Sequence, residues 1–567
     1  MGNLRPVLIV GLVFLGYMMW VEWQKDYGVA PAARPQAVSD QAQYAPDTPD
    51  VPSMANTPAQ TEADLPAPVD QGPSPSIEGS TETQKARASL ITVRTDVLEI
   101  EIDLQGGTLV SAILLDYPVK QKEPDNLIHL MQPRGEQMFI AQSGLLSHQE
   151  APNHTSLYQA ERMEYTLSAG MDELRVPLTW KSEEGVEVTK TFVFRPGNYD
   201  VDVLHRVENK GQASWAGSRY EQLQRAVSGE EGSGGFTNPE RYSFFGVGFY
   251  NPEDKFEKID FDDIAGDPYK KTTANGWLAM IQHYFFAAWI PPAVEETTYS
   301  TQALSGGGLS RFIARGVSPA RQVNPGQSAE FDSKLYLGPK LQDQIPEIAP
   351  GLEYTVNYGI FTVFSKPLFW LLDKIHGLVG NWGWAIVILT ILIKAAFFKL
   401  TEAQYRSTAR MRKLQPRIEQ LKERYGDDRQ RMSQAMMEMY KKEKVNPLGG
   451  CLPILVQIPI FIALYWVLLE SVELRQAPFI LWIDNLSVRD PYFILPALNA
   501  IFMFATQRLT PMVGMDPLQQ KMMQMMPIVF SIMFAFFPAG LVLYWATNAG
   551  LSLAQQYYIT RKIAAQD

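Results

Sequence analysis

Metal-binding residues are scarce in this sequence, which has a single cysteine, Cys451, among 567 residues. One cysteine cannot form a disulfide within the chain, a zinc site built from several thiolates or an iron–sulfur cluster. The six histidines are scattered and include no His-x-x-x-His pair, so a histidine-based metal site has no support either. We therefore expect no metal and no cofactor.

Catalytic motifs are missing as well. The chain has no Gly-x-Ser-x-Gly and no phosphate-binding loop, and the run of three glycines at 306–308 is not followed by Lys and Ser or Thr. Carboxylate pairs such as Glu183-Glu184 and Glu230-Glu231 lie beside glycine, a pattern typical of solvated turns. The net charge of −11 argues against DNA as a partner. We expect that the protein is not an enzyme and has no catalytic residues.

Long apolar runs are present, but they are unevenly distributed. The first covers residues 6–23, about 27 Å as a helix, which is enough to cross the hydrocarbon core of a bilayer. A cleaved secretory signal is the alternative, but this run is longer than the usual signal core of about 7–15 residues and ends in Trp20 and Trp23 instead of small residues. We predict an uncleaved transmembrane anchor over residues 1–23.

Five further membrane spans are predicted in the C-terminal third. An apolar run of about 36 residues, from 524 to 559, would be about 54 Å long as one helix, which is too long for a single crossing. We divide it at Pro538, inside a Phe-Pro-Ala-Gly string typical of a turn. The uncharged stretch 276–294 is instead predicted to be the core of a soluble domain, because Gln282 and His283 lie at its middle. The predicted spans are 381–400, 448–470, 492–507, 524–537 and 538–559.

The charges of the connecting loops predict the orientation. Segment 401–447 carries twelve Lys or Arg and seven Asp or Glu, whereas 471–491 carries two Arg, two Asp and one Glu. Because basic loops remain in the cytoplasm, 401–447 is expected inside and 471–491 in the periplasm. Both termini, including the tail 560–567, are then cytoplasmic, and the chain between the first and second spans is periplasmic.

This periplasmic part divides into a linker, a β domain and a connector. Residues 24–87 contain ten prolines and many more acidic than basic residues, which predicts a disordered acidic linker. Apolar and charged residues then alternate, as in Leu98 to Leu104, and hairpin patterns recur, so 88–343 is predicted to form a large all-β sandwich. In the connector 344–380, residues 365–379 have one apolar face and predict a helix that lies on the membrane surface.

Lys394 lies inside the span 381–400, about six residues from its cytoplasmic end, where a charge costs about 3 kcal/mol or more unless it is hydrated or paired. Two interpretations remain open. The lysine stem can extend its ammonium to the headgroups, or the ammonium can face a water-filled cavity. Thr390 lies one turn earlier on the same face. Uncharged polar residues of the other spans are candidates for lining such a cavity: Gln457, Asn499, Thr506, Gln507, Ser531, Thr547, Asn548 and Gln555.

Segment 401–447 is predicted to form a cytoplasmic helical hairpin. An apolar seam at coiled-coil spacing includes Leu414 and Ile418, and Gly426 marks the turn. The loop 508–523 is rich in methionine, which suits a surface that accepts varied apolar partners, or ordinary packing at a membrane interface. Candidate partner-binding residues of the hairpin are Arg412, Lys413, Arg417, Arg424 and Arg429.

Seven strings occur in order over about 200 residues of the C-terminal part. They are Asn381-Trp-Gly-Trp384, Leu414-Gln-Pro416, Lys444-Val-Asn-Pro-Leu-Gly-Gly-Cys451, Gln457-Ile-Pro-Ile460, Ser471-Val-Glu-Leu-Arg-Gln-Ala-Pro478, Asp490-Pro-Tyr-Phe-Ile-Leu-Pro496 and Phe537-Pro-Ala-Gly-Leu-Val-Leu-Tyr544. These strings resemble the bacterial YidC membrane protein insertases of the YidC/Oxa/Alb family. The N-terminal anchor, the acidic linker and the large β domain resemble the Gram-negative form of this family.

The resemblance implies a multi-domain membrane protein. Its parts would be an all-α polytopic core of five helices plus an N-terminal anchor helix, and a large exported all-β domain of the supersandwich type. The family's core has a hydrophilic groove that is closed outside and open to cytosol and lipid. The groove arginine of the family corresponds here to Lys394, which keeps the charge but not the planar guanidinium. Candidate groove residues are Lys394, Thr390, Gln457, Tyr544 and Trp545.

The function implied is a non-enzymatic insertase and chaperone of the bacterial inner membrane, working alone or with the Sec translocon. The implied partners are nascent membrane proteins, the ribosome, the Sec translocon (SecYEG and SecDF) and membrane lipids. Two rival functions are a secondary transporter that uses Lys394 as its substrate site and an envelope sugar enzyme whose β domain is the catalyst. The spans show no internal repeat of the kind common in transporters. Deleting about residues 90–335 separates the enzyme from the insertase, because only the insertase is expected to survive.

Overall fold

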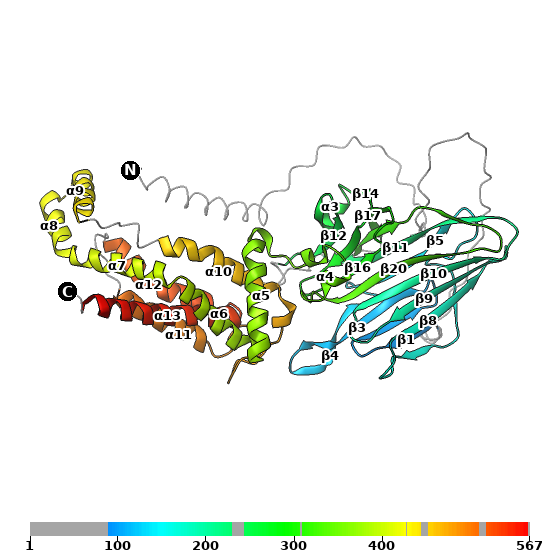
Figure 1. Ribbon diagram of the computed structural model, residues 1–567, viewed down its shortest axis with the longest axis horizontal. Helices are drawn as coiled ribbons and strands as arrows, with labels where there is room; N and C mark the ends of the chain where they lie inside the picture. Colours follow the sequence, from blue (N-terminus) through cyan, green and yellow to red (C-terminus); the bar gives the residue numbers. More distant parts are fainter. Residues whose placement is uncertain are drawn as a thin grey trace. The chain divides into compact units, whose positions relative to one another are not determined.

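The computed structural model describes residues 89–228, 243–306, 309–426, 428–443, 452–509 and 517–564 (Figure 1). The predicted anchor 1–23 and the acidic linker 24–87 lie outside the described residues, as do the string 444–451 and the first part of the methionine-rich loop. In the described part, the strands come first and most of the helices follow. The large all-β domain predicted from the alternating pattern is thus confirmed.

The strands of the described residues form two sheets. The larger sheet has eleven strands, in the spatial order β14 (Lys270–Thr273), β17 (Thr297–Gly306), β18 (Leu309–Val317), β11 (Trp215–Val227), β5 (Phe139–Ser147), β3 (Thr108–Lys120), β2 (Leu98–Asp103), β1 (Leu90–Arg94) and β7 (Glu164–Thr166), with β19 (Arg321–Val323) beside β11 and β4 (Glu123–Met131) beside β3. The smaller sheet has nine, in the order β13 (Lys255–Asp260), β12 (Gly246–Asn251), β15 (Trp277–Ile281), β16 (Phe285–Ile290), β20 (Ser328–Pro339), β10 (Asp200–Asn209), β9 (Val186–Phe194), β8 (Leu174–Lys181) and β6 (Gln159–Ala160).

The alternating sequence pattern decides which side chains these strands bury. In β2, Leu98, Ile100 and Ile102 are buried while the acidic residues between them are half-buried. One of the recurring hairpin patterns, over residues 186–207, is present as the antiparallel pair β9–β10. Gly197 in its turn has a φ of 71°, which glycine adopts without strain. The uncharged stretch 276–294 contains β15 and β16, which are buried strands and not a membrane helix.

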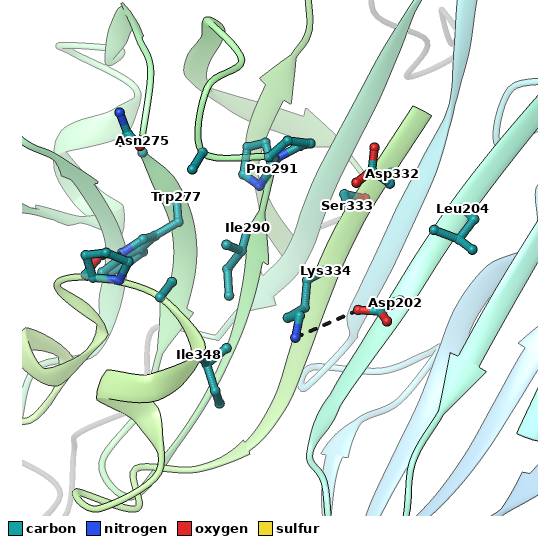
Figure 2. Close-up of a pocket in the computed structure, with 15 residues that line it drawn as sticks. Asp202, Leu204, Asn275, Trp277, Ile290, Pro291, Asp332, Ser333, Lys334 and Ile348 are labelled. Atoms are coloured by element: carbon teal, nitrogen blue, oxygen red, sulfur yellow. Dashed lines mark hydrogen bonds and ion pairs between the residues drawn. The ribbon is translucent and has the colours of Figure 1, made fainter. Parts of the chain in front are cut away.

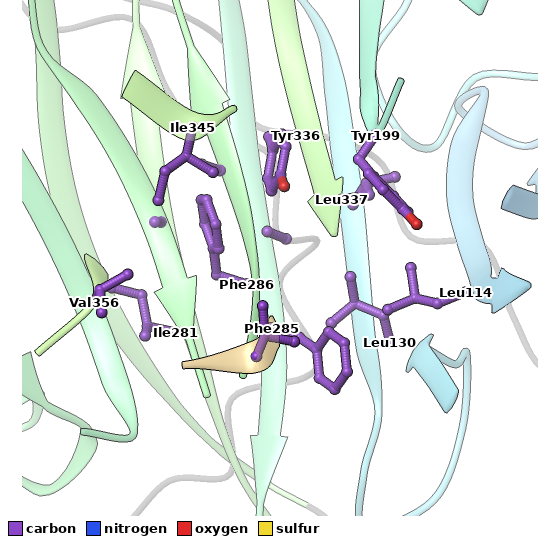
Figure 3. Packing of buried hydrophobic residues seen from close by; sticks show 14 of the residues in the cluster. Leu114, Leu130, Tyr199, Ile281, Phe285, Phe286, Tyr336, Leu337, Ile345 and Val356 are labelled. Carbon is purple, nitrogen blue, oxygen red and sulfur yellow. The ribbon is translucent and has the colours of Figure 1, made fainter. Parts of the chain in front are cut away.

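Buried apolar side chains of both sheets belong to one hydrophobic core, part of which is shown in Figure 3. The indole Nε1 of Trp289 in β16 donates a hydrogen bond of 3.2 Å to the backbone oxygen of Gln222 in β11, so the two sheets are in direct contact. Phe286 and Tyr336 stack with ring centroids 4.6 Å apart. Burying a side chain of this size contributes about 1.5–3 kcal/mol, so this stacked pair adds to the stability of the smaller sheet.

A lysine is buried in the same core. Lys190 in β9 is fully buried, and its Nζ donates hydrogen bonds to the backbone oxygens of Gly106, Gly107 and Ser143, at 3.0, 2.8 and 3.0 Å. Burial lowers the pKa of the Lys190 ammonium to about 7. His205 lies opposite Lys190 in β10, and burial, together with the nearby Lys190 charge, lowers the pKa of this imidazole well below its usual range.

Helices form the rest of the described chain. Two short helices belong to the β domain region, and the remainder follow it. The helices are α3 (Phe261–Ile264), α4 (Ile345–Ile348), α5 (Thr362–Val379), α6 (Trp382–Ala396), α7 (Phe398–Lys413), α8 (Gln415–Tyr425), α9 (Arg429–Lys442), α10 (Leu452–Glu470), α11 (Ile494–Leu509), α12 (Pro517–Phe534) and α13 (Ala539–Ala564), with short 3-10 helices η2 (Leu352–Thr355), η3 (Gly359–Phe361) and η5 (Val472–Leu474).

Several helix boundaries differ from the predicted ones. The chain breaks between α6 and α7 with a bend of 62°, so the predicted span 381–400 is not one straight helix. Helix α12 begins at Pro517, well before the predicted start at 524, and part of the predicted loop 508–523 is therefore helical. This extension contains Gln, Met and Lys, which favour a helix without extending the apolar run. The break predicted at Pro538 is present, between α12 and α13.

Length and composition also bear on membrane crossing. No single helix among the described residues is both long and apolar enough to cross a membrane. The bent pair Trp382–Ala396 and Phe398–Ser407 meets the criterion together, and shorter apolar helices occur at Gln457–Glu470 and Ile494–Leu509.

Most of α7, together with α8 and α9, lies in the range predicted for the cytoplasmic hairpin. Helices α8 and α9 are joined at Gly426, and Asp428 accepts a hydrogen bond of 3.0 Å from the backbone N–H of Arg431, which caps α9. Leu414 and Ile418 are buried, and the residues packed against them come from α9: Met436, Met439 and Tyr440.

Candidate functional site

A cavity of about 420 Å³ lies between α11, α12 and α13. Its lining combines methionine and aromatic side chains with four uncharged polar ones from the candidates noted in the sequence. The lining residues are Asn499, Met503, Thr506 and Gln507 of α11, Met523, Met526, Pro527, Phe530 and Phe534 of α12, and Trp545, Asn548, Ala549 and Ser552 of α13. Such a lining can accept an apolar segment while it offers hydrogen bonds to polar groups.

One face of α13 supplies the polar wall of this cavity. Trp545, Asn548 and Ser552 are three and four residues apart, so they share one side of the helix. The Ser552 hydroxyl donates a hydrogen bond of 2.7 Å to the backbone oxygen of Asn548. The Trp545 ring lies against Phe534, with centroids 3.4 Å apart, which joins this wall to α12.

Lys394 meets the cavity wall from outside. It lies in the last turn of α6, is 7% exposed, and donates a hydrogen bond of 2.8 Å from Nζ to Oγ of Ser552. Ser552 lines the cavity, so the Lys394 ammonium is bonded directly to a residue of the cavity wall. Among the described residues, the ion pairs of the chain include none to Lys394.

The other predicted groove residues are only partly brought together. The Nε2 of Gln457 in α10 donates to Oδ1 of Asn548 at 3.0 Å, so Gln457 and Lys394 contact neighbouring turns of α13. Trp545 lines the cavity directly. Tyr544 is buried, with its ring 6.2 Å from that of Phe461 in α10.

Thr390 is bonded within its own helix. Its hydroxyl donates a hydrogen bond of 2.7 Å to the backbone oxygen of Ile386, one turn earlier in α6, and the residue is almost fully buried. The hydroxyl therefore satisfies its own helix, and Thr390 is not among the residues that line the cavity.

Ser552 was not among the residues singled out from the sequence. Its spacing from Trp545 and Asn548 was visible as a helical face in the last apolar segment. What the sequence does not reveal is that Lys394, 158 positions away, reaches this face, because that depends on how α6 packs on α13.

The basic residues of the helical hairpin are distributed over three helices. Arg412 and Lys413 end α7, Arg417 and Arg424 belong to α8, and Arg429 begins α9. The structure describes the side chains of Arg417 and Arg424, which are exposed. Arg417 forms an ion pair of 2.5 Å with Glu443, which partly neutralises it.

A second cavity, of about 360 Å³, lies in the β domain (Figure 2). Its charged lining residues are Asp202, Asp332 and Lys334. The Lys334 ammonium lies 2.6 Å from a carboxylate oxygen of Asp200 and 3.8 Å from one of Asp202. This lysine is thus held by carboxylates, in contrast to Lys394.

Comparisons with known proteins match the whole described chain. The family model described as the YidC periplasmic domain matches residues 90–371, and that described as the 60Kd inner membrane protein matches 374–566. A "membrane protein insertase YidC" of Thioalkalivibrio sulfidiphilus is 49% identical over 573 residues, covering 99% of each chain. One of Methylococcus capsulatus is 49% identical over 565 residues, again covering 99% of each.

The chain belongs to the YidC family of membrane protein insertases. The resemblance inferred from the sequence strings is therefore confirmed. The β domain corresponds to the periplasmic domain of YidC, and the helices from α6 onward correspond to its inner membrane part. A solved structure described as the active YidC insertase with its first transmembrane domain resolved matches with a TM-score of 0.38 and 21% identity, covering 83% of this chain and 92% of that chain. The family assignment rests on the sequence matches.

Proposed function

We propose that this protein inserts nascent membrane proteins into the bacterial inner membrane, without catalysing a reaction, and that the cavity beside Lys394 is its substrate groove. The observation that carries the proposal is the Lys394–Ser552 hydrogen bond, which joins a buried cation to the wall of a partly polar cavity. Family membership supports the insertase activity, and the cavity supplies a location for it.

The surface of the helices around the cavity supports a membrane location. Large apolar side chains on α11 and α12 are exposed, among them Ile501 at 62%, Val529 at 60% and Ile532 at 61%. An exposed apolar surface of this kind is unfavourable in water and favourable against lipid tails. The cavity between α11, α12 and α13 would therefore lie within the hydrocarbon layer.

The proposed mechanism depends on the difference between the partly polar cavity and the apolar lipid around it. The least favourable step of insertion is to carry the polar or acidic tail of a client across hydrocarbon. Hydrogen bonds from Asn499, Gln507 and Asn548 and the charge of Lys394 would replace part of the tail's hydration. The apolar span of the client would leave past the methionines of α12 into lipid, and its partition into the bilayer supplies the free energy.

Topology and partners complete the proposal. The basic hairpin would be cytoplasmic, where Arg424 and its neighbours could contact the ribosome, and the β domain would be periplasmic. Both termini would be cytoplasmic. Helix α5 would lie on the periplasmic surface of the inner membrane, where its exposed apolar residues contact lipid. Trp370, 61% exposed, and Leu378, 86% exposed, are apolar side chains at the surface of α5, whereas Leu372 and Ile375 are buried against the protein. Cooperation with the Sec translocon is inferred from the family alone.

The test is an insertion assay in vesicles with two clients that differ only in an acidic or a neutral translocated tail. Lys394→Arg should retain insertion, because the positive charge stays at the same place. Lys394→Met keeps the stem but removes the charge, and should lower insertion of the acidic client more than that of the neutral one. Equal, undiminished insertion of both clients by the Met variant would remove Lys394 from the mechanism. It would favour the interpretation in which the lysine stem extends its ammonium to the headgroups.

A second assay addresses the rival function in the β domain. Deletion of about residues 90–335 removes the second cavity and its carboxylates but leaves α6 to α13 intact. Insertion should largely persist in this variant. Complete loss of insertion, with the truncated protein present in the membrane at the normal level, would contradict a groove formed by the helices alone.

A further inference from the structure

Ser552 is the residue through which Lys394 reaches the cavity. A serine hydroxyl has one proton to donate and two lone pairs to accept with. The proton of Ser552 is used in the 2.7 Å bond to the backbone oxygen of Asn548, so the oxygen faces the Lys394 ammonium as an acceptor, at 2.8 Å. The direction of this hydrogen bond is therefore fixed by the bond that Ser552 makes within its own helix.

Another serine in the helices makes the same internal bond. The Ser531 hydroxyl donates a hydrogen bond of 2.7 Å to the backbone oxygen of Pro527. The bond from Ser552 to Asn548 is thus ordinary for a helical serine. The distinguishing feature of Ser552 is the hydrogen bond that it accepts from an ammonium of another helix.

The surroundings of Ser552 hold it in place. The hydroxyl of Tyr405 in α7 donates a hydrogen bond of 3.3 Å to the backbone oxygen of Ser552. One turn earlier, the side chain of Asn548 is bonded to Gln457 of α10. Helices α6, α7 and α10 therefore all contact this short stretch of α13, which makes the Ser552 hydroxyl a fixed acceptor.

We propose that Ser552 is a positioning residue that holds the Lys394 ammonium at the wall of the substrate groove. The inference rests on the function proposed above. A lysine carries a compact charge on a flexible stem, whereas an arginine presents a rigid planar fork. An ammonium therefore needs a fixed acceptor to remain at one place, and without it the stem is free to carry the charge away from the cavity towards the headgroups.

The experiment compares Ser552→Ala with wild type in the vesicle assay, using full-length protein and the matched acidic and neutral clients. The measured quantity is the ratio of acidic-client to neutral-client insertion. Loss of one hydrogen bond to a charged group should lower this ratio about tenfold or more. Ser552→Thr keeps the hydroxyl and should restore most of the ratio. Ser531→Ala, which removes the same internal bond in α12 outside the cavity lining, should leave the ratio unchanged.

A double variant separates positioning from packing. If Ser552 acts through Lys394, then Lys394→Met and Lys394→Met combined with Ser552→Ala should have the same ratio. A further loss in the double variant, or an equal loss for both clients in Ser552→Ala alone, would overturn the inference in favour of a packing role. A wild-type ratio for Ser552→Ala beside a lowered ratio for Lys394→Met would overturn it while the proposed function stands. A normal ratio for Lys394→Met would instead contradict the proposed function itself.

Discussion

The side-chain amide of Gln457 in α10 donates a hydrogen bond of 3.0 Å to Oδ1 of Asn548 in α13. Both residues are partly buried, and Asn548 also lines the cavity beside Lys394. A hydrogen bond between amide side chains of two helices that expose apolar residues connects these helices at one defined place, because an unpaired amide is costly in apolar surroundings.

This pair should contribute measurably to the stability of the helices. Gln457→Ala and Asn548→Ala each remove one partner, and the coupling energy between them should be about 0.5–1.7 kcal/mol, as for other hydrogen bonds between membrane helices. The measurement is the free energy of unfolding in detergent micelles for the wild type, the two single variants and the double variant. Strictly additive losses would mean that the two amides do not stabilise each other.

The buried Lys190 should make the stability of the β domain depend on pH. Its pKa is about 7 in the folded chain and 10.5 as the ordinary value. Between these values the unfolded chain binds more protons, so the free energy of unfolding should rise as the pH increases from about 7 to 10. His205 has its pKa lowered below 6.5 and so contributes at lower pH. Urea unfolding of a fragment covering residues 88–343 at several pH values measures the slope.

Substitution identifies the group responsible for this slope. Lys190→Met should remove the part of the pH dependence between 7 and 10 that one proton explains, whereas Lys270→Met, at an exposed lysine, should leave the slope unchanged. The same slope in wild type and Lys190→Met would assign the pH dependence to other groups.

Association of the hairpin with ribosomes should weaken as the salt concentration rises, because contacts between arginine and phosphate release counterions. Replacing Arg417 and Arg424 by Gln should weaken binding and reduce the slope of log affinity against log salt by roughly one for each arginine that had bound a phosphate. The control replaces Glu419 and Glu423 on the same helix by Gln, which should not weaken binding. Co-sedimentation with stalled ribosomes provides the measurement, and salt-independent binding would exclude this mode of docking.

The C-terminal end should be cytoplasmic. A reporter enzyme that is active only in the periplasm should be silent when fused after Asp567 and active when inserted in the loop 471–491. Activity at the C-terminal end would mean that an odd number of segments crosses the membrane, and the division of the last apolar run at Pro538 into two spans would then be wrong.

The β domain was predictable because its strands follow a local rule. In β2 and β9, alternate apolar residues give the buried face directly. The strand order was not predictable, since neighbours such as β10 and β20 are far apart in the sequence and pair only through the tertiary fold. The buried Lys190 also escaped notice, because a lysine in an alternating strand is ordinarily at the surface.

For the helices, the sequence predicted the positions better than the boundaries. Apolar runs located them, but the bend between α6 and α7 and the early start of α12 were missed, because helix formation depends on the backbone and not on hydrophobicity alone. Within the site, Lys394 was recognised as a charge in an apolar segment. Its partner Ser552 was missed, because a single hydroxyl in an apolar helix is unremarkable until packing brings a cation to it.

The break after α6 has an electrostatic consequence for Lys394. Helix α6 ends at Ala396, two residues beyond the lysine. The aligned peptide dipoles of a helix give its C-terminal end about half a negative charge, which acts within the last turn. A lysine in this turn is favoured by backbone groups that, unlike a carboxylate, cannot be titrated. An incoming acidic tail would not have to compete with an internal counter-ion, and a continuous helix through residue 397 would lose this advantage.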